Sequence, residues 1–254
     1  EQTLRDSGAD AVLCGEGEVA LPAYLDDLGR GGDGRSAPNF WFLEGGAAIS
    51  NPPAPYIQDL DSLPLADYGA VDYQGVLDEN IRVAVLLAGR GCPWACTFCS
   101  VGYMKQKGAG KYARLRSVGH VVGELEHLKA NYEVDHVFFR DDTFTWHREW
   151  AMEFCEAMAA RQLLPFEILS RVDCLDDEMI AALKRAGCTC VWIGIDAGDG
   201  HIRMDLLEKG TTYEQIIDTA DRLHAAGITV MTTNMVGLPH ETPEKFRKTV
   251  ELNR

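Results

Sequence analysis

Three cysteines, Cys92, Cys96 and Cys99, have the type and spacing that indicate chemistry most clearly in this sequence. They directly follow an apolar run over residues 83–88. Structural zinc sites usually take four ligands, often as two separated pairs, and no second pair of suitable form is present. Three thiolates can instead bind three irons of a 4Fe-4S cube and leave the fourth iron open to a ligand. The alternative is three buried structural thiols without a metal.

The strands that must position these cysteines can be read from the apolar pattern. Each candidate strand is followed by a segment of helical periodicity, and this alternation predicts a parallel sheet with right-handed crossovers. An open α/β sheet and a partial barrel both fit. The predicted strands cover residues 83–88, 134–140, 166–170, 189–195 and 228–236.

The intervening helices are indicated by their apolar faces and their end signals. Two are predicted over residues 118–131 and 147–163. Asp176 can cap a third, which Gly187 would end. Thr211 and Glu214 are spaced as a capping box for a fourth. Thr242-Pro243 is typical of the start of a fifth helix.

Polar residues follow the predicted strands at their carboxyl ends. In parallel α/β architectures ligands bind at that edge, so these residues and Cys92 are expected to face one mouth. Taken singly, the aspartates could cap the following helix, and Arg171 could form a surface pair with Asp173. The strand-end residues are Asp141, Asp142, Arg171, Asp196 and the turn Gly237-Leu238-Pro239.

The cysteine segment resembles the signature of the radical S-adenosylmethionine (SAM) superfamily, Cys-x-x-x-Cys-x-aromatic-Cys, with Phe98 as the aromatic residue. The resemblance implies a 4Fe-4S cluster on the three cysteines, with SAM chelated by the open iron. Reductive cleavage of SAM would then produce a 5′-deoxyadenosyl radical that abstracts hydrogen from a small-molecule substrate. It also implies a partial (β/α)6 TIM-like barrel, here truncated after about five strands, and an electron donor such as flavodoxin or ferredoxin.

Further motifs are similar to those of one large branch of this superfamily. Asp141-Asp142-Thr143-Phe144 resembles its Asp-Asp-x-Phe, and Ser170-Arg171-Val172-Asp173 its Ser-Arg-x-Asp. Asp196 stands where the branch usually has glutamate, Ala197 where it has serine, and His240 where it has glycine. If that last position requires positive φ, histidine is a strained choice. The resemblance implies SAM contacts at Phe98, Asp141, Asp142, Arg171, Asp196, Gly237 and Pro239; it assigns no catalytic side chain.

The N-terminal part resembles the end of the cobalamin-binding domain found in many of these enzymes. The predicted division is residues 1–34 as the remnant of that Rossmann-like domain, 35–71 as a linker rich in proline and aspartate, and 72–254 as an incomplete radical SAM core. We expect the longer parent protein to bind cobalamin, and this fragment to bind it poorly. The candidate cobalamin contacts are Gly15, Glu16, Gly17 and Glu18.

The formal charge of −15 is unevenly distributed. Residues 1–80 hold fifteen acidic and three basic side chains and so contribute −12 of it. An acidic surface repels a phosphate backbone, which argues against nucleic acid as a partner. Residues 100–120 hold five basic side chains and no acidic one, which predicts a solvated loop or contact with an anionic ligand. No apolar run is long enough to span a bilayer.

Together these features predict a cytoplasmic radical SAM enzyme, most specifically a cobalamin-dependent methyltransferase or a related enzyme that functionalises C–H bonds. A methylthiotransferase would share the barrel but needs an N-terminal cysteine triad, and residues 1–80 contain only Cys14. A non-catalytic iron–sulfur binding module is the alternative from another class. Cleavage of SAM distinguishes it from both enzymes.

Overall fold

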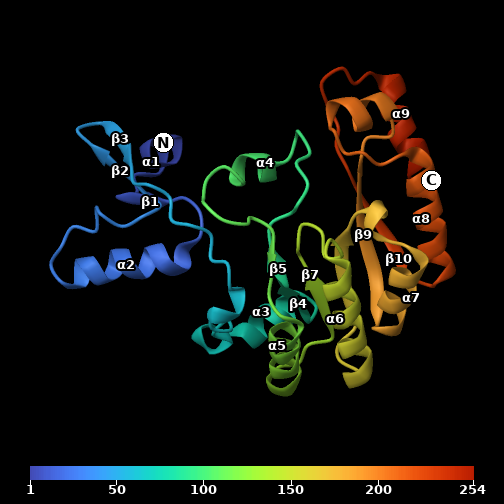
Figure 1. Ribbon diagram of the computed structural model, residues 1–254, viewed down its shortest axis with the longest axis horizontal. Coiled ribbons are helices and arrows are strands. Elements are labelled where there is room, and N and C mark those ends of the chain that lie inside the picture. Colours follow the sequence, from blue (N-terminus) through green and yellow to red (C-terminus); the bar gives the residue numbers. More distant parts are fainter. The chain divides into compact units, whose positions relative to one another are not determined.

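The computed structural model describes residues 1–254, which form two compact units (Figure 1). Unit 1 consists of residues 1–63 and 102–112, and unit 2 of residues 64–101 and 113–254. The division falls at Leu63 and Pro64, within the segment predicted as a linker and before the predicted boundary at residue 72. Residues 102–112 follow the cysteine motif in the chain but pack in unit 1.

Unit 1 is built around a small antiparallel sheet. Near the start of unit 1 lie α1 (Gln2–Ser7), β1 (Ala11–Leu13) and α2 (Gly17–Gly29). The hairpin of β2 (Phe40–Glu44) and β3 (Ala47–Ser50) lies where only a linker was predicted, and β2 pairs with β1. Alternating residues of β2 point inward, and the Phe40 ring stacks on Tyr24 of α2 at 4.5 Å between centroids.

Residues 102–112 are held in unit 1 by backbone and amide hydrogen bonds. The helix α4 (Ser100–Met104) leads into this segment. The Tyr56 amide donates to the Ala109 carbonyl at 2.9 Å, and Gln58 exchanges hydrogen bonds with the backbone of Lys111 at 3.1 and 3.3 Å. The short helix η1 (Leu60–Ser62) follows this contact in the chain.

Unit 2 contains the predicted parallel sheet, and all five strands are confirmed. The spatial order is β10, β9, β8, β7 and β4, and every neighbouring pair is parallel. Each strand therefore ends at the same edge of the sheet. The strands are β4 (Val83–Leu86), β7 (His136–Phe139), β8 (Phe166–Ser170), β9 (Cys188–Asp196) and β10 (Thr229–Asn234).

The helices of unit 2 alternate with these strands. Asp176 and Thr242 cap their helices as predicted. No helix of the chain is long and apolar enough to cross a membrane. The α-helices are α3 (Tyr73–Glu79), α5 (Val118–Asn131), α6 (Arg148–Arg161), α7 (Asp177–Arg185), α8 (Tyr213–Ala225) and α9 (Pro243–Leu252). Shorter elements are η2 (Tyr68–Ala70), η3 (Val172–Cys174) and the π-helical turn η4 (Ile202–Leu206).

The capping box predicted at Thr211 and Glu214 is wrong by one residue. Thr212 caps α8, and its partner is Gln215. Thr211 is instead buried, with 1% of its surface exposed, and its carbonyl accepts a hydrogen bond from Arg203 Nε at 2.7 Å. Because Thr211 is buried, the helix begins at the next threonine, Thr212, which is more exposed.

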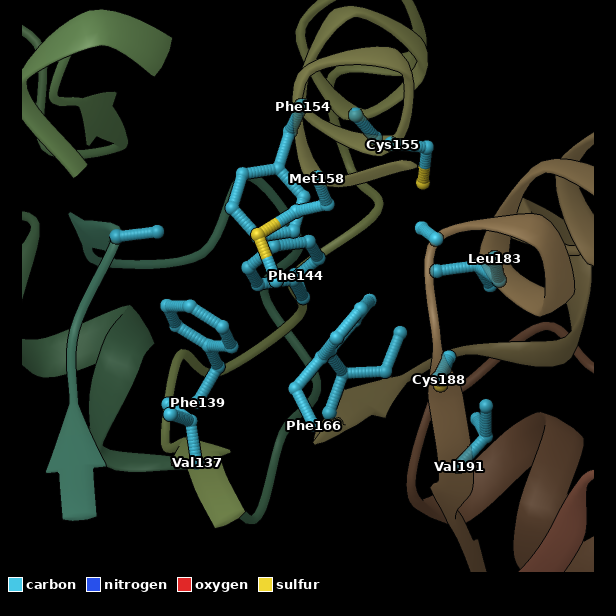
Figure 2. Packing of buried hydrophobic residues seen from close by; sticks show 14 of the residues in the cluster. Val137, Phe139, Phe144, Phe154, Cys155, Met158, Phe166, Leu183, Cys188 and Val191 are labelled. Atoms are coloured by element: carbon cyan, nitrogen blue, oxygen red, sulfur yellow. The ribbon is translucent and has the colours of Figure 1, made fainter. Parts of the chain in front are cut away.

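An aromatic core between the sheet and its helices fixes the positions of the strand ends (Figure 2). Phe139 of β7, Phe154 of α6 and Phe166 of β8 are fully buried, and their rings meet edge to face. Phe144 joins them from the loop after β7 and is equally buried. Burial of each such ring contributes about 2–3 kcal/mol. The loop that carries Asp141 and Asp142 is therefore held at both ends by core residues.

Candidate functional site

The loop that carries the three cysteines is closed at its base by a short hairpin of β5 (Gly89–Arg90) and β6 (Arg114–Leu115). Gly89 is required there because a Cβ atom would lie 2.4 Å from the Arg114 carbonyl oxygen. The Asp141 carboxylate accepts hydrogen bonds from the amides of Ala88 at 2.9 Å and Gly89 at 2.7 Å. The end of β7 thus holds the start of the cysteine loop.

The same loop is also anchored near its middle. Thr97, between the second and third cysteines, donates from its amide to the Leu207 carbonyl at 3.1 Å and from its hydroxyl to the Leu206 carbonyl at 2.6 Å. The Cys99 amide donates to the Cys96 carbonyl at 3.0 Å, which closes a turn around Thr97. These bonds hold the part of the loop that carries Cys96 and Cys99.

The cysteines line a cavity of about 200 Å³ at the carboxyl ends of the strands. Other predicted site residues share this cavity: Phe98, Asp142, Arg171 and Asp196. Trp94 of the cysteine loop also lines it, together with Thr143, Trp192, Lys209 and Thr233, to which sequence reasoning assigned no site role. Alternation along β9 and β10 could have indicated the inward-facing Trp192 and Thr233, whereas Lys209 lies in a loop with no such pattern.

Three predicted SAM contacts do not line the cavity. Asp141 lies beneath the cysteine loop with 6% of its surface exposed, and its carboxylate is occupied by the two backbone amides. Burial raises the pKa of Asp141 to about 6, against the opposing effect of those hydrogen bonds. Gly237 and Pro239 lie in the turn after β10, where the Gly237 amide donates to Glu241 Oε2 at 2.7 Å. His240 in this turn has φ 62°, the left-handed conformation that makes histidine a strained choice.

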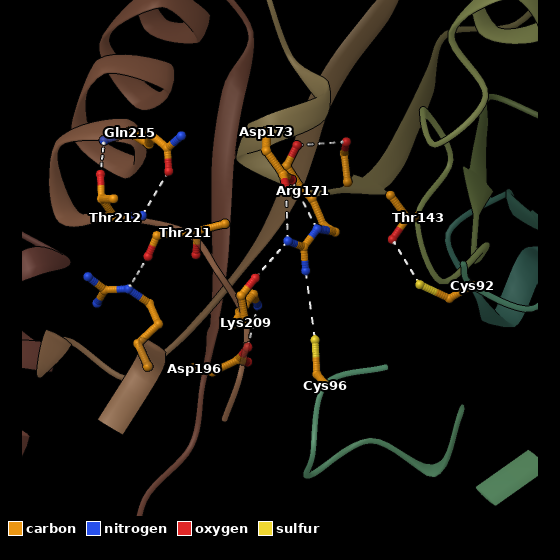
Figure 3. A network of polar contacts seen from close by, with 12 residues as sticks. Cys92, Cys96, Thr143, Arg171, Asp173, Asp196, Lys209, Thr211, Thr212 and Gln215 are labelled. Atoms are coloured by element: carbon orange, nitrogen blue, oxygen red, sulfur yellow. Dashed lines mark hydrogen bonds and ion pairs between the residues drawn. The ribbon is translucent and has the colours of Figure 1, made fainter. Parts of the chain in front are cut away.

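Two of the cysteines have side-chain partners at the cavity (Figure 3). The Cys92 sulfur lies 3.7 Å from the Thr143 hydroxyl, and Arg171 Nη1 donates to the Cys96 sulfur at 3.8 Å. Burial raises the pKa of the Cys92 thiol, and a cation bound to the sulfur would favour the thiolate.

The donor set of the cavity fits an iron–sulfur cluster. No three His, Cys, Asp or Glu side chains of the chain converge as ligands of a single metal ion. A 4Fe-4S cube does not require that convergence, because each thiolate binds a different iron. Three cysteines from one anchored loop at the edge of a cavity meet its requirement for three sulfur ligands and an open side.

A buried ion pair also lines the cavity. Lys209 Nζ contacts the Asp196 carboxylate, and less than a tenth of either side chain is exposed. Gly194 permits this contact, since a Cβ atom there would lie 2.6 Å from Lys209 Nζ. Asp196 ends β9 with φ 65°, next to a register shift between β9 and β10. The carboxylate predicted to contact SAM is therefore already paired with a cation.

The candidate cobalamin residues lie in unit 1. Gly15 borders a cavity of about 440 Å³ whose wall includes Trp41, Asn51 and Lys107. Glu16 points elsewhere, because its carboxylate accepts from the Ile57 amide at 2.8 Å. Gly17 and Glu18 form the first turn of α2. Of the four predicted residues, only Gly15 lines the cavity.

Comparison with known proteins places this geometry in a family. Residues 86–252 match the radical SAM superfamily. An uncharacterized methyltransferase of Pyrococcus horikoshii is 29% identical over 99% of the chain and 54% of its own length. The anaerobic magnesium-protoporphyrin IX monomethyl ester cyclase of Rubrivivax gelatinosus is 32% identical over 96% of the chain and 44% of its own length. The chain thus spans about half the length of these relatives.

A solved structure confirms the predicted barrel. The radical SAM methyltransferase TsrM from Kitasatospora setae, with cobalamin and a [4Fe-4S] cluster bound, has a TM-score of 0.78 and 22% identity, covering 98% of this chain and 49% of TsrM. The five-stranded parallel sheet is accordingly a partial radical SAM barrel. With the match over residues 86–252, the chain belongs to the radical SAM superfamily.

Proposed function

We propose that this chain is the SAM-cleaving core of a radical SAM enzyme, with a 4Fe-4S cluster held by Cys92, Cys96 and Cys99. The observation that carries the proposal is that all three cysteines, from one anchored loop, line the cavity at the carboxyl ends of the sheet. When bound, such a cluster would supply an open iron that binds SAM and the electron that breaks a sulfur–carbon bond of SAM. The products of that cleavage are methionine and a 5′-deoxyadenosyl radical.

The chain's own residues would bind and orient SAM in this cavity. Phe98 is 42% exposed at the cavity and is the proposed contact for the adenine through its backbone. Asp142 also lines the cavity, and its pKa is raised by burial, so an ammonium group nearby would stabilise its charged form. Asp196, with its partner Lys209, is a proposed SAM contact within the cavity. Gly237 and Pro239, in the turn after β10, remain predicted contacts that do not line it. Asp141 acts through the backbone of residues 88 and 89.

For the complete protein we propose a cobalamin-dependent methyltransferase or a related C–H functionalising enzyme. The relative from P. horikoshii and TsrM are both named as methyltransferases, and TsrM has cobalamin bound. The cavity beside Gly15 in unit 1 is the proposed contact region for part of the cobalamin. A one-electron carrier such as flavodoxin or ferredoxin, a small-molecule substrate and a cytoplasmic location remain predictions.

The test begins with anaerobic reconstitution of the chain and of two variants, Cys96→Ser and Cys14→Ser. Cys14 is exposed in unit 1 and serves as the matched control. We expect iron and sulfide equal to one 4Fe-4S cluster in the wild type and the control, and a marked loss in Cys96→Ser. Iron content unchanged by Cys96→Ser would refute the assignment.

A second measurement distinguishes an enzyme from a binding module. After reduction with dithionite, the electron paramagnetic resonance (EPR) spectrum is recorded with and without SAM, and 5′-deoxyadenosine is measured by mass spectrometry. We expect SAM to alter the spectrum and 5′-deoxyadenosine to accumulate. A reduced cluster whose spectrum ignores SAM, with no 5′-deoxyadenosine formed, would support the non-catalytic module instead.

A further inference from the structure

Arg171, the first residue after β8, is a buried cation with several partners (Figure 3). Its side chain is 8% exposed. Nε and Nη2 donate to the two carboxylate oxygens of Asp173 at 2.9 and 2.8 Å. Nη2 also donates to the Lys209 carbonyl at 2.8 Å, and Nη1 donates to the Cys96 sulfur at 3.8 Å. All three guanidinium nitrogens are therefore engaged.

The flat face of the guanidinium is covered as well. Its central carbon lies 4.5 Å from the centre of the Trp94 ring, which belongs to the cysteine loop. Two residues of that loop, Trp94 and Cys96, thus contact one arginine whose orientation Asp173 fixes by a two-pronged ion pair. Arginine binds a carboxylate through two parallel N–H groups, and in Arg171 the Nε and Nη2 groups already bind the Asp173 carboxylate.

We infer that Arg171 is a positioning residue for the cluster, rather than a ligand of the SAM carboxylate: it holds the Cys96 sulfur in place and stabilises the reduced cluster. This inference rests on the proposed function, since it needs the cluster on Cys96. Reduction adds one electron from an external donor, with no bond made or broken and no proton moved. The added negative charge strengthens the attraction to the fixed guanidinium and the hydrogen bond to sulfur.

Hydrogen bonds to the sulfur ligands and nearby charge are among the factors that set cluster potentials. Loss of a charge-assisted hydrogen bond that is stronger in the reduced state lowers the ratio of reduced to oxidised cluster. We expect a decrease of about tenfold at a fixed potential, which for a one-electron couple corresponds to about 59 mV. The midpoint potential should therefore become more negative when Arg171 is replaced.

The experiment is an EPR-monitored potentiometric titration of the anaerobically reconstituted chain in the absence of SAM. The test variant is Arg171→Gln. Arg171→Gln leaves the Asp173 charge unpaired, and this charge would itself make reduction harder. The double variant Arg171→Gln/Asp173→Asn is therefore measured too. The double variant removes both charges, so the lost contact to Cys96 is the remaining difference from the wild type. Arg148→Gln removes an arginine from an exposed ion pair with Asp176 and is the matched control.

We expect more negative midpoint potentials in both Arg171 variants and an unchanged potential in Arg148→Gln. A cluster that loads normally in the double variant at the wild-type potential would overturn the inference. If the Arg171 variants keep the wild-type potential but their EPR spectra respond to SAM only at higher SAM concentrations than the wild type, the inference is overturned in favour of a SAM contact. If neither Arg171→Gln nor the charge-retaining Arg171→Lys holds any cluster, Arg171 has a purely structural role and the inference is overturned. Absence of a cluster in the wild type would instead refute the proposed function.

Discussion

Asp141 offers a quantitative test of how the cysteine loop is held. Its carboxylate is buried and accepts the amides of Ala88 and Gly89, and its pKa is raised from 3.8 to about 6. Between pH 3.8 and about pH 6, Asp141 is therefore more often protonated in the folded chain than in the unfolded chain. It follows that the contribution of Asp141 to stability decreases as pH rises from about 4 to about 6. At about 1.4 kcal/mol per pH unit, the decrease is about 3 kcal/mol.

The assay compares the wild type with Asp141→Asn, which cannot titrate. Urea unfolding of the reduced apo chain is followed by tryptophan fluorescence at several pH values, and the free energy of unfolding is extracted at each. Asparagine offers one acceptor oxygen where the carboxylate offers two, so the variant's free energy of unfolding is also lower by about 1–3 kcal/mol. The informative quantity is the change with pH of the difference between the two proteins.

We expect the wild type minus variant difference to be greatest near pH 4 and to fall by about 3 kcal/mol by pH 7. Parallel profiles for the two proteins across this range would refute the reasoning, because they would mean that Asp141 has the same proton affinity in the folded and unfolded chains. A difference that rises with pH would mean that its hydrogen bonds outweigh its burial.

Three further perturbations test the site and the core. Replacing Lys209 by Met leaves the Asp196 charge buried and unpaired, and should lower the free energy of unfolding by about 3–5 kcal/mol; Arg148→Met, at an exposed pair, should cost less than about 1 kcal/mol in the same urea titration. Replacing His240 by Gly relieves φ 62° and should stabilise the chain by up to about 1 kcal/mol, and a lower unfolding midpoint would contradict the strain. Phe154→Ala removes a fully buried ring and should cost about 3–5 kcal/mol by the same assay, whereas a loss under 1 kcal/mol would contradict the packing in Figure 2.

Local spacing in the sequence determined the sheet and the cysteine motif. The five strands are short apolar runs between helices with one apolar face, and each pattern depends on residues that are neighbours in the chain. The caps at Asp176 and Thr242 were readable for the same reason. The capping box was misplaced because the choice between Thr211 and Thr212 depends on Arg203, a tertiary partner.

The division into units required the tertiary structure. The hairpin of β2 and β3 pairs with β1 across about thirty residues in the register of Ala11 with Phe42, and the proline-rich segment after it obscured this signal. Residues 102–112 carry basic side chains but no periodicity, and only their hydrogen bonds to Tyr56 and Gln58 assign them to unit 1.

At the candidate site, the sequence alone determined which thiols and carboxylates are present, and that they follow parallel strands. It could not assign their partners. Lys209 reaches Asp196 across thirteen residues, and Arg171 reaches Cys96 across seventy-five. Such pairs depend on where loops fold back, and loop conformation follows no repeat that a sequence displays. The tertiary structure therefore decided that Asp141 supports the loop, that Lys209 neutralises Asp196, and that Arg171 faces a cysteine sulfur.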